Sequence, residues 1–236
     1  MNDTFDSISK ISFRVEFLYI QTAKRAIEAA ESLWPKIELE IRNLREMEST
    51  YKLTSAALEM DFDGQRPERS KDPAAIALAD KSTSIGLLYR PLLEQLAIAQ
   101  LMSANSLESY VNGVAEDTLA SGDRECFRNM PLSAKCLFLP AIAGIERLAP
   151  GREPLLSLRN LVRWRNELVH YRHPSEAWDS QIVPTFLKDL GLDIRDARKS
   201  IDAVGEYALH VQESLGRPMK GWLDDDVEYF EWEFTF

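Results

Sequence analysis

The feature that most constrains the fold is the helical spacing of apolar residues. After Asp193, apolar side chains recur at alternating intervals of three and four residues: Ile194, Ala197, Ile201, Val204, Ala208, Val211 and Leu215. This spacing places them on one face of an α-helix that Asp193 can cap and that Gly216 and Pro218 end. We find no convincing alternation of apolar and polar residues that would indicate strands. The sequence therefore predicts an all-α protein.

The first part of the chain predicts a helical hairpin. Two long helical stretches, residues 5–33 and 36–61, flank Trp34 and Pro35. Because proline is tolerated in the first turn of a helix and is unfavourable inside one, a hinge at Pro35 is the economical interpretation. The polar segment 62–73 is rich in turn residues and predicts the boundary of this hairpin.

The middle of the chain predicts two more helices. One covers residues 73–100, with Pro91 as the place for a kink. The other begins at Ser106, which can cap it, and stops at Gly122. Its apolar face is formed by Leu107, Tyr110, Val111 and Val114.

Two loops and a tail complete the predicted organisation. Residues 121–131 and 174–184 are predicted loops. We divide the chain into a hairpin at 1–72, a helical domain at 73–216 and a tail at 217–236. The tail interleaves acids with aromatic residues. It either folds back on the body or docks as a short segment, onto a partner or onto a basic site of its own chain.

The charge of the chain is segregated. The net charge is -10, and a pI near 4.9 argues against broad, nonspecific adhesion to nucleic acid. Residues 147–173 nevertheless hold six arginines and two acids, a local net charge of +4. This segment is the place to look for a local anion-binding site.

Metal, cofactor and export signals are not apparent in the sequence. Cys126 and Cys136 have no CxxC or Cys/His spacing, and the three histidines form no HExxH pattern. Neither a GxxxxGK[ST] loop nor a GxSxG elbow is present. The acidic start lacks the pattern of a signal peptide, and the longest nearly apolar run, 136–145, is about half a membrane span. We expect a cytoplasmic protein without metal or cofactor.

One further helix, predicted at residues 153–172, carries most of the cationic segment. Pro154 lies near its start and Pro174 just beyond its end. Arg165 projects near the middle of its apolar face, which is formed by Leu155, Leu158, Leu161, Val162, Leu168 and Val169. A guanidinium is costly to bury without a partner, so Arg165 must meet an acid, a carbonyl, a ligand or water. A second, polar stripe comprises Arg159, Arg163, Asn166, His170 and His173.

The run R-N-E-L-V-H, from Arg165 to His170, resembles the R-x4-6-H motif of the HEPN superfamily, in which a polar residue often follows the arginine. In that superfamily the motif lies on a late helix of a four- or five-helix bundle. Here, too, a loop and a final amphipathic helix follow the motif. The resemblance covers roughly residues 75–216, and it implies a HEPN-like bundle with an added N-terminal hairpin and acidic tail.

The resemblance implies metal-independent RNA cleavage. Histidine exchanges protons near neutral pH, and arginine binds nonbridging phosphate oxygens. His170 and Arg165 fit these roles, and Asn166 can orient the imidazole or bind phosphate or ribose. The residues expected to position the RNA backbone are Arg159, Arg163, Arg172 and His173.

Such nucleases commonly dimerise, so that two motif helices face each other across a composite cleft. We therefore expect a homodimeric ribonuclease, acting as a toxin or as a stress or defence effector, with an antitoxin or regulatory protein as a possible partner. Two alternatives remain open: a catalytically inactive HEPN-like module that binds a nucleotide or a protein, and an unrelated helical scaffold.

Overall fold

The computed structural model describes residues 7–61, 72–170, 187, 190–216 and 230–235, with side chains for 13–53, 72–170, 187 and 190–216. Six helices and two strands lie in these residues: β1 (Ser7–Phe13), α1 (Val15–Asp61), α2 (Pro73–Thr118), α3 (Ser121–Arg128), α4 (Leu132–Ile142), α5 (Leu155–Val169), α7 (Ile194–Ser214) and β2 (Phe230–Thr235). The all-α prediction is confirmed for the body of the protein.

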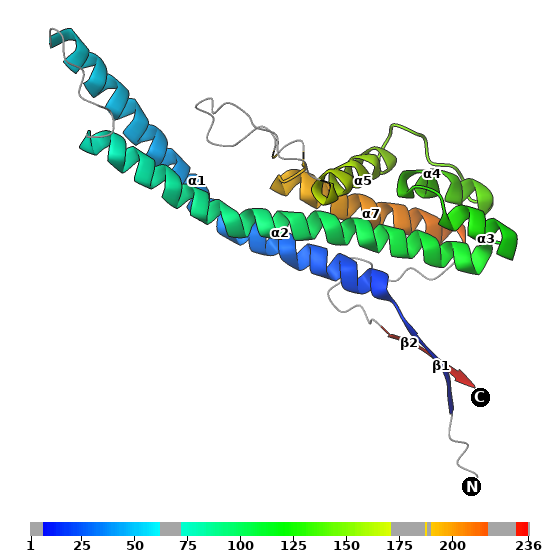
Figure 1. Ribbon diagram of the computed structural model, residues 1–236. Helices are drawn as coiled ribbons and strands as arrows, with labels where there is room; N and C mark the ends of the chain where they lie inside the picture. Colours follow the sequence, from blue (N-terminus) through cyan, green and yellow to red (C-terminus); the bar gives the residue numbers. More distant parts are fainter. Residues whose placement is uncertain (1–6, 62–71, 171–186, 188–189, 217–229, 236) are drawn as a thin grey trace.

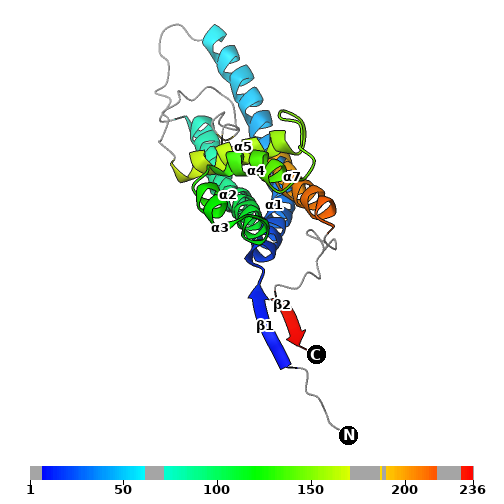
Figure 2. The same ribbon diagram turned by 90° about the vertical axis from the view of Figure 1, so that its right-hand side faces the viewer.

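Two long antiparallel helices form the axis of the molecule (Figure 1). α1 and α2 lie side by side along most of their length, and the shorter helices α3, α4, α5 and α7 gather around the C-terminal half of α2 (Figures 1 and 2). One hydrophobic core joins α1, α2, α4, α5 and α7. Within the described helices, none has the length and apolarity needed to cross a membrane.

The predicted hinge at Pro35 is wrong, because α1 is one helix from Val15 to Asp61 with Pro35 inside it. The apolar positions stay in phase across the proline. Ala30, Ile37, Ile41 and Leu44 are buried, and Trp34 is partly buried against the same core. Packing of this continuous stripe against α2 offsets the hydrogen bond that the proline cannot donate. The hairpin of the structure is therefore formed by α1 and α2.

The predicted separate helix that begins at Ser106 is also wrong. α2 runs without a break from Pro73 to Thr118 and includes Pro91. Ser106 is fully buried, and its hydroxyl donates to the carbonyl of Glu16 at 2.8 Å, which links α2 to the start of α1. The residues of the predicted apolar face are buried as expected: Leu107, Tyr110, Val111 and Val114.

The predicted loop at 121–131 is largely helical, because α3 spans Ser121–Arg128. Asp123 in the first turn and Arg128 in the last turn have the charges that favour those helix ends. Phe127 supplies the apolar contact and is 1% exposed. The sequence analysis gave more weight to the turn-forming residues than to this single buried aromatic side chain.

The predicted final helix is confirmed as α7. Asp193 caps it, and its carboxylate accepts hydrogen bonds from the backbone N–H groups of Arg195 and Asp196. Gly216, with φ of +63°, follows the helix end in a conformation that suits glycine. The inner face of the helix is buried at Ala197, Ile201, Val204, Ala208 and Val211.

The two ends of the chain form an antiparallel ribbon that the sequence analysis did not predict. β1 pairs with β2 in a register that sets Ile8 opposite Phe234 and Ile11 opposite Trp232. The predicted helix from residue 5 is therefore wrong over Ser7–Phe13. The ribbon lies on the opposite side of the body from α5 (Figures 1 and 2), so β2 does not cover the cationic helix. The rest of the predicted tail, residues 217–229 and 236, lies outside the described residues.

Candidate functional site

α5, the helix of the R-N-E-L-V-H run, is shorter than predicted. It begins after Pro154, and the carboxylate of Glu153 accepts a hydrogen bond from the backbone N–H of Ser157 at 3.2 Å. It ends at Val169, and the backbone N–H of His170 donates to the carbonyl of Asn166 at 2.9 Å. Since Pro174 has no N–H to donate to the carbonyl of residue 170, a helix could not continue regularly to this point.

The buried face of α5 differs from the predicted one. Leu158, Leu161 and Val162 are buried as expected, but Trp164 is buried as well, and Val169 is 55% exposed. Arg165 therefore lies at the edge of the buried face, with its side chain 36% exposed, and not in the middle of that face. The packing of α5 against α2, α4 and α7 sets this rotation of the helix.

Trp164 fixes the rotation through a close contact that the sequence analysis missed. Gly191 has φ of +65°, and a Cβ there would lie 2.6 Å from Cγ of Trp164. Gln100 of α2 donates to the carbonyl of Gly191 at 2.9 Å and so holds the glycine in place. The guanidinium of Arg163 lies over the indole ring at 5.9 Å. A tryptophan between two arginines is the one sequence signal that pointed to this anchor.

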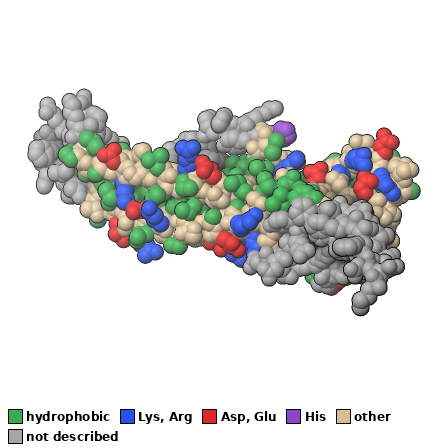
Figure 3. All heavy atoms as spheres, turned by 90° about the horizontal axis from the view of Figure 1, so that it is seen from below, with side chains coloured by type: hydrophobic (Ala, Val, Ile, Leu, Met, Phe, Trp, Pro, Cys, Tyr) green, Lys and Arg blue, Asp and Glu red, His purple; other side chains and the backbone are tan. Residues whose placement is uncertain are grey.

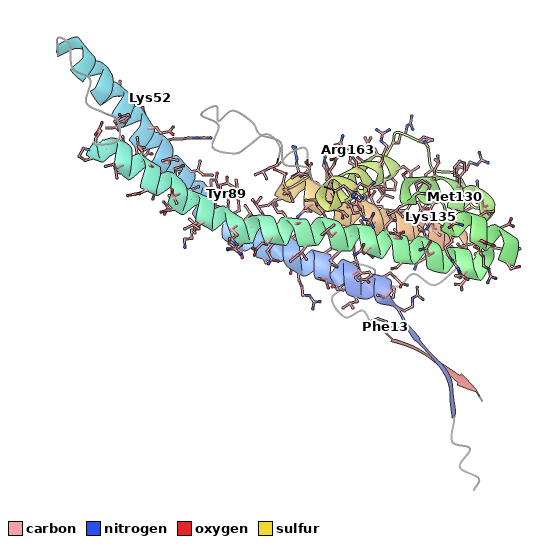
Figure 4. All side chains as sticks on the ribbon, in the orientation of Figure 1. Phe13, Lys52, Tyr89, Met130, Lys135 and Arg163 are labelled. Atoms are coloured by element: carbon pink, nitrogen blue, oxygen red, sulfur yellow. The ribbon has the colours of Figure 1, made fainter. Side chains whose placement is uncertain are left out.

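The predicted polar stripe lies on the exposed side of α5. Arg159, Arg163, Asn166 and His170 are all exposed, and Figure 4 shows Arg163 on the outer side of the body. Arg172 and His173 lie outside the described residues, so their predicted role stays a prediction. The chain therefore presents Arg159, Arg163, Asn166 and His170 on one exposed side of α5.

Arg165 and Asn166 are in direct contact. Nη1 of Arg165 donates to Oδ1 of Asn166 at 3.2 Å. His170 lies one turn further on and is joined to Asn166 through the backbone hydrogen bond that ends the helix. The amide oxygen of Asn166 thus faces the guanidinium, whereas the sequence analysis considered a contact with the imidazole.

Beside Arg165 lies a polar cluster that the sequence analysis did not identify. Nη2 of Arg165 is 3.9 Å from Oε2 of Glu108 on α2. The other carboxylate oxygen, Oε1, is 4.0 Å from Nζ of Lys135 on α4. Lys135 is 3% exposed, donates to Oδ1 of Asn112 at 3.0 Å and lies between α4 and α2 (Figure 4). The available sequence signal was a lysine in the otherwise apolar run of α4.

The cysteine beside this cluster is buried. Cys136 follows Lys135 and is buried, and burial raises the pKa of its thiol to about 12. The thiol is therefore protonated near neutral pH and is a poor nucleophile. In the part of the chain that the structure describes, no group of three or more His, Cys, Asp or Glu side chains is arranged to hold a metal ion.

The surface seen from below the view of Figure 1 is mixed. Figure 3 shows hydrophobic side chains gathered near the middle of this face, with charged side chains scattered around them.

Comparisons with known proteins found no matching family model, no similar curated protein and no similar solved structure. The resemblance to the HEPN superfamily therefore depends on the R-N-E-L-V-H run and on the helical surroundings described above.

Proposed function

We propose that the protein is a metal-independent endoribonuclease of HEPN type. The observation that carries the proposal is that the guanidinium of Arg165 has no close acidic partner among the described residues. This guanidinium is partly exposed, and the nearest acid among the residues that the structure describes, Glu108, is 3.9 Å away, beyond the 2.7–2.9 Å typical of a charge-assisted hydrogen bond. Donor groups of the guanidinium can therefore bind an incoming phosphate. Asn166 and His170 lie on the same exposed part of the helix.

The proposed reaction is an attack of the RNA 2'-hydroxyl on the adjacent phosphorus. A bond forms between the 2'-oxygen and phosphorus, and the bond from phosphorus to the 5'-oxygen breaks. A histidine acting as base removes the 2'-hydroxyl proton, and an acid protonates the leaving 5'-oxygen. Arg165 stabilises the charge that develops on the nonbridging oxygens. The products carry a 2',3'-cyclic phosphate and a 5'-hydroxyl.

The base and the acid act on opposite sides of the phosphate, and one α5 helix supplies one Arg165–His170 motif. We therefore assign the site to a symmetric homodimer in which two α5 helices face each other. Val169, 55% exposed and directly before His170, would be covered in such a contact. Each protomer then contributes one histidine to a composite cleft.

In a cell, such an activity suits a toxin or a stress or defence effector that acts on RNA in the cytoplasm. An antitoxin or another regulatory protein would then restrain the enzyme. Overexpression of the wild-type chain should slow growth, and overexpression of the His170→Ala variant should not.

RNA cleavage by four purified variants tests the proposal: Arg165→Ala, His170→Ala, the double variant and Arg195→Ala. Arg195 is an exposed arginine on α7 and serves as the matched control. We expect each single motif variant to lose most activity, the double variant to be little worse and Arg195→Ala to retain it, because Arg165 and His170 act as a unit. A folded wild-type protein that leaves every RNA intact would favour the nucleotide- or protein-binding alternative.

The dimer has its own test. The mass of the wild-type protein in solution at micromolar concentration should be that of two chains, and the motif variants should keep this mass. A strictly monomeric protein would contradict the composite site.

A further inference from the structure

Glu108 occupies an unusual position between two cations from different helices. Its Oε1 faces Lys135 of α4 at 4.0 Å, and its Oε2 faces Arg165 of α5 at 3.9 Å. The carboxylate itself comes from α2, so three helices meet at this one group. We infer that Glu108, held by Lys135, is a positioning residue that sets the guanidinium of Arg165 for phosphate binding.

Lys135 has to keep a charged partner because it is almost fully buried. Its side chain is 3% exposed, and its ammonium group donates to Asn112 and lies 5.9 Å from the centre of the Phe127 ring. A neutral amide and an aromatic ring compensate a buried charge only in part. Glu108 supplies the negative charge, and Lys135 in turn fixes where that charge lies.

Glu108 faces two cations and forms a close pair with neither. A carboxylate facing a single arginine tends to form a close, bidentate pair that uses several guanidinium donors. Oε2 of Glu108 is 3.9 Å from Nη2 of Arg165, and Oε1 is 4.0 Å from Nζ of Lys135, so the carboxylate attracts both cations and leaves guanidinium donors available. The cluster holds two cations and one carboxylate and so still attracts a phosphate.

A matched control lies on the same helix. Glu116 is also on α2, its side chain is 46% exposed against 39% for Glu108, and it pairs with Arg124 and Arg128 of α3. Glu116→Gln therefore removes an acid of similar exposure that also faces two cations, away from Arg165. If Glu108→Gln lowers activity and Glu116→Gln does not, the loss comes from the place of Glu108 beside Arg165 and not from the removal of one negative charge.

The functional test rests on the proposed ribonuclease activity. We expect Glu108→Gln to lower kcat about 10- to 100-fold, as a misplaced catalytic group does, with KM nearly unchanged. Glu116→Gln should leave both parameters unchanged. Since Glu108→Gln leaves Lys135 buried without its acid, the double variant Glu108→Gln/Lys135→Met is the second test. It removes both charges, should stay folded and should show the same loss of kcat.

A measurement without RNA separates this inference from the proposed function. The NMR signal of the Arg165 Nε group can be assigned because it disappears in Arg165→Lys. This signal should report restricted motion of the guanidinium in wild type and in Glu116→Gln, and freer motion in Glu108→Gln. If the guanidinium is as restricted in Glu108→Gln as in wild type, the inference is overturned, whatever the RNA-cleaving activity of the variant. A mobile guanidinium with unchanged kcat overturns the positioning role. If wild type does not cleave RNA, the proposed function fails, and the Arg165 signal alone decides whether Glu108 holds the guanidinium.

Discussion

The two halves of α2 have the same secondary structure and very different surroundings. From Pro73 to Pro91, a stretch that the structure describes in full, Ile85 is the one fully buried residue, and Leu87 is 69% exposed. From Leu92 to Thr118, buried residues recur on nearly every turn, up to Ala115. Figure 1 shows the first half lying along α1, away from the smaller helices that surround the second half.

This contrast shows why the candidate site lies where it does. The second half of α2 holds buried polar groups with defined partners, such as Gln100 with the carbonyl of Gly191 and Ser106 with that of Glu16. Glu108 also belongs to this half. A polar cluster needs neighbours on several sides to keep a fixed geometry. The second half of α2 has such neighbours in α1 and the shorter helices, whereas the first half lies along α1 alone.

The largest expected difference concerns two leucines of α2. Leu107 is fully buried, so Leu107→Ala should lower the free energy of unfolding by about 2 to 5 kcal/mol. Leu87 is 69% exposed, so Leu87→Ala should change it by less than about 0.5 kcal/mol. Denaturant unfolding followed by circular dichroism measures both. Equal losses would remove the distinction between the halves.

A pair of glycines should give effects of opposite sign. Gly191→Ala places a Cβ against the Trp164 ring at a positive φ and should cost about 3 kcal/mol of unfolding free energy. Gly86 lies in the first half of α2 with no neighbouring atom within 4 Å of an added Cβ. Gly86→Ala should therefore stabilise the protein by about 0.5 to 1 kcal/mol. If Gly191→Ala is tolerated without loss, the Trp164 contact does not anchor α5.

The smallest expected difference concerns surface ion pairs beside the two halves. A hydrogen bond from Lys81 holds the pKa of Glu40 below its ordinary value of 4.5, and one from Arg128 does the same for Glu116. Each pair therefore stabilises the fold at pH values above the pKa that the glutamate has in the unfolded chain. This contribution is lost as the pH falls through the lower pKa that the glutamate has in the folded chain. NMR titration of the two carboxyl groups should show both midpoints below 4.5, and Lys81→Met should raise that of Glu40 alone. If the titration midpoint of Glu40 is the same in wild type and in Lys81→Met, the pair does not form in solution.

Local patterns in the sequence predicted the parts of the fold that depend on nearby residues. Asp193 and the apolar spacing after it identified α7, and the spacing of the polar stripe predicted the exposed side of α5. The continuity of α1 was also readable, because Ala30, Ile37 and Ile41 stay in phase across Pro35. A proline inside a helix is unfavourable in isolation, and here the packing of this face against α2 outweighs that cost.

The rest depends on contacts between distant parts of the chain. The pairing of Ser7–Phe13 with Phe230–Thr235 joins the two ends of the sequence, and no local pattern specifies such a partner. The cluster around Arg165 takes Glu108 from α2 and Lys135 from α4. Glu108 resembles an ordinary helix charge in the sequence, and the position of Lys135 in a mostly apolar run does not say which acid it meets. Only packing of the three helices brings them together.

We propose that α5 carries a ribonuclease site that uses Arg165 and His170, and the sharpest test of this proposal follows the cleavage of a single RNA bond. An end-labelled RNA and the same strand with a 2'-deoxy sugar at the cleaved position are incubated with wild type and with His170→Ala in the presence of a chelator. We expect wild type to cleave only the ribose form, to leave a 2',3'-cyclic phosphate and a 5'-hydroxyl, and to do so about 10²- to 10⁴-fold faster than His170→Ala. Equal cleavage by the two proteins, or cleavage of the 2'-deoxy strand, would contradict the claim.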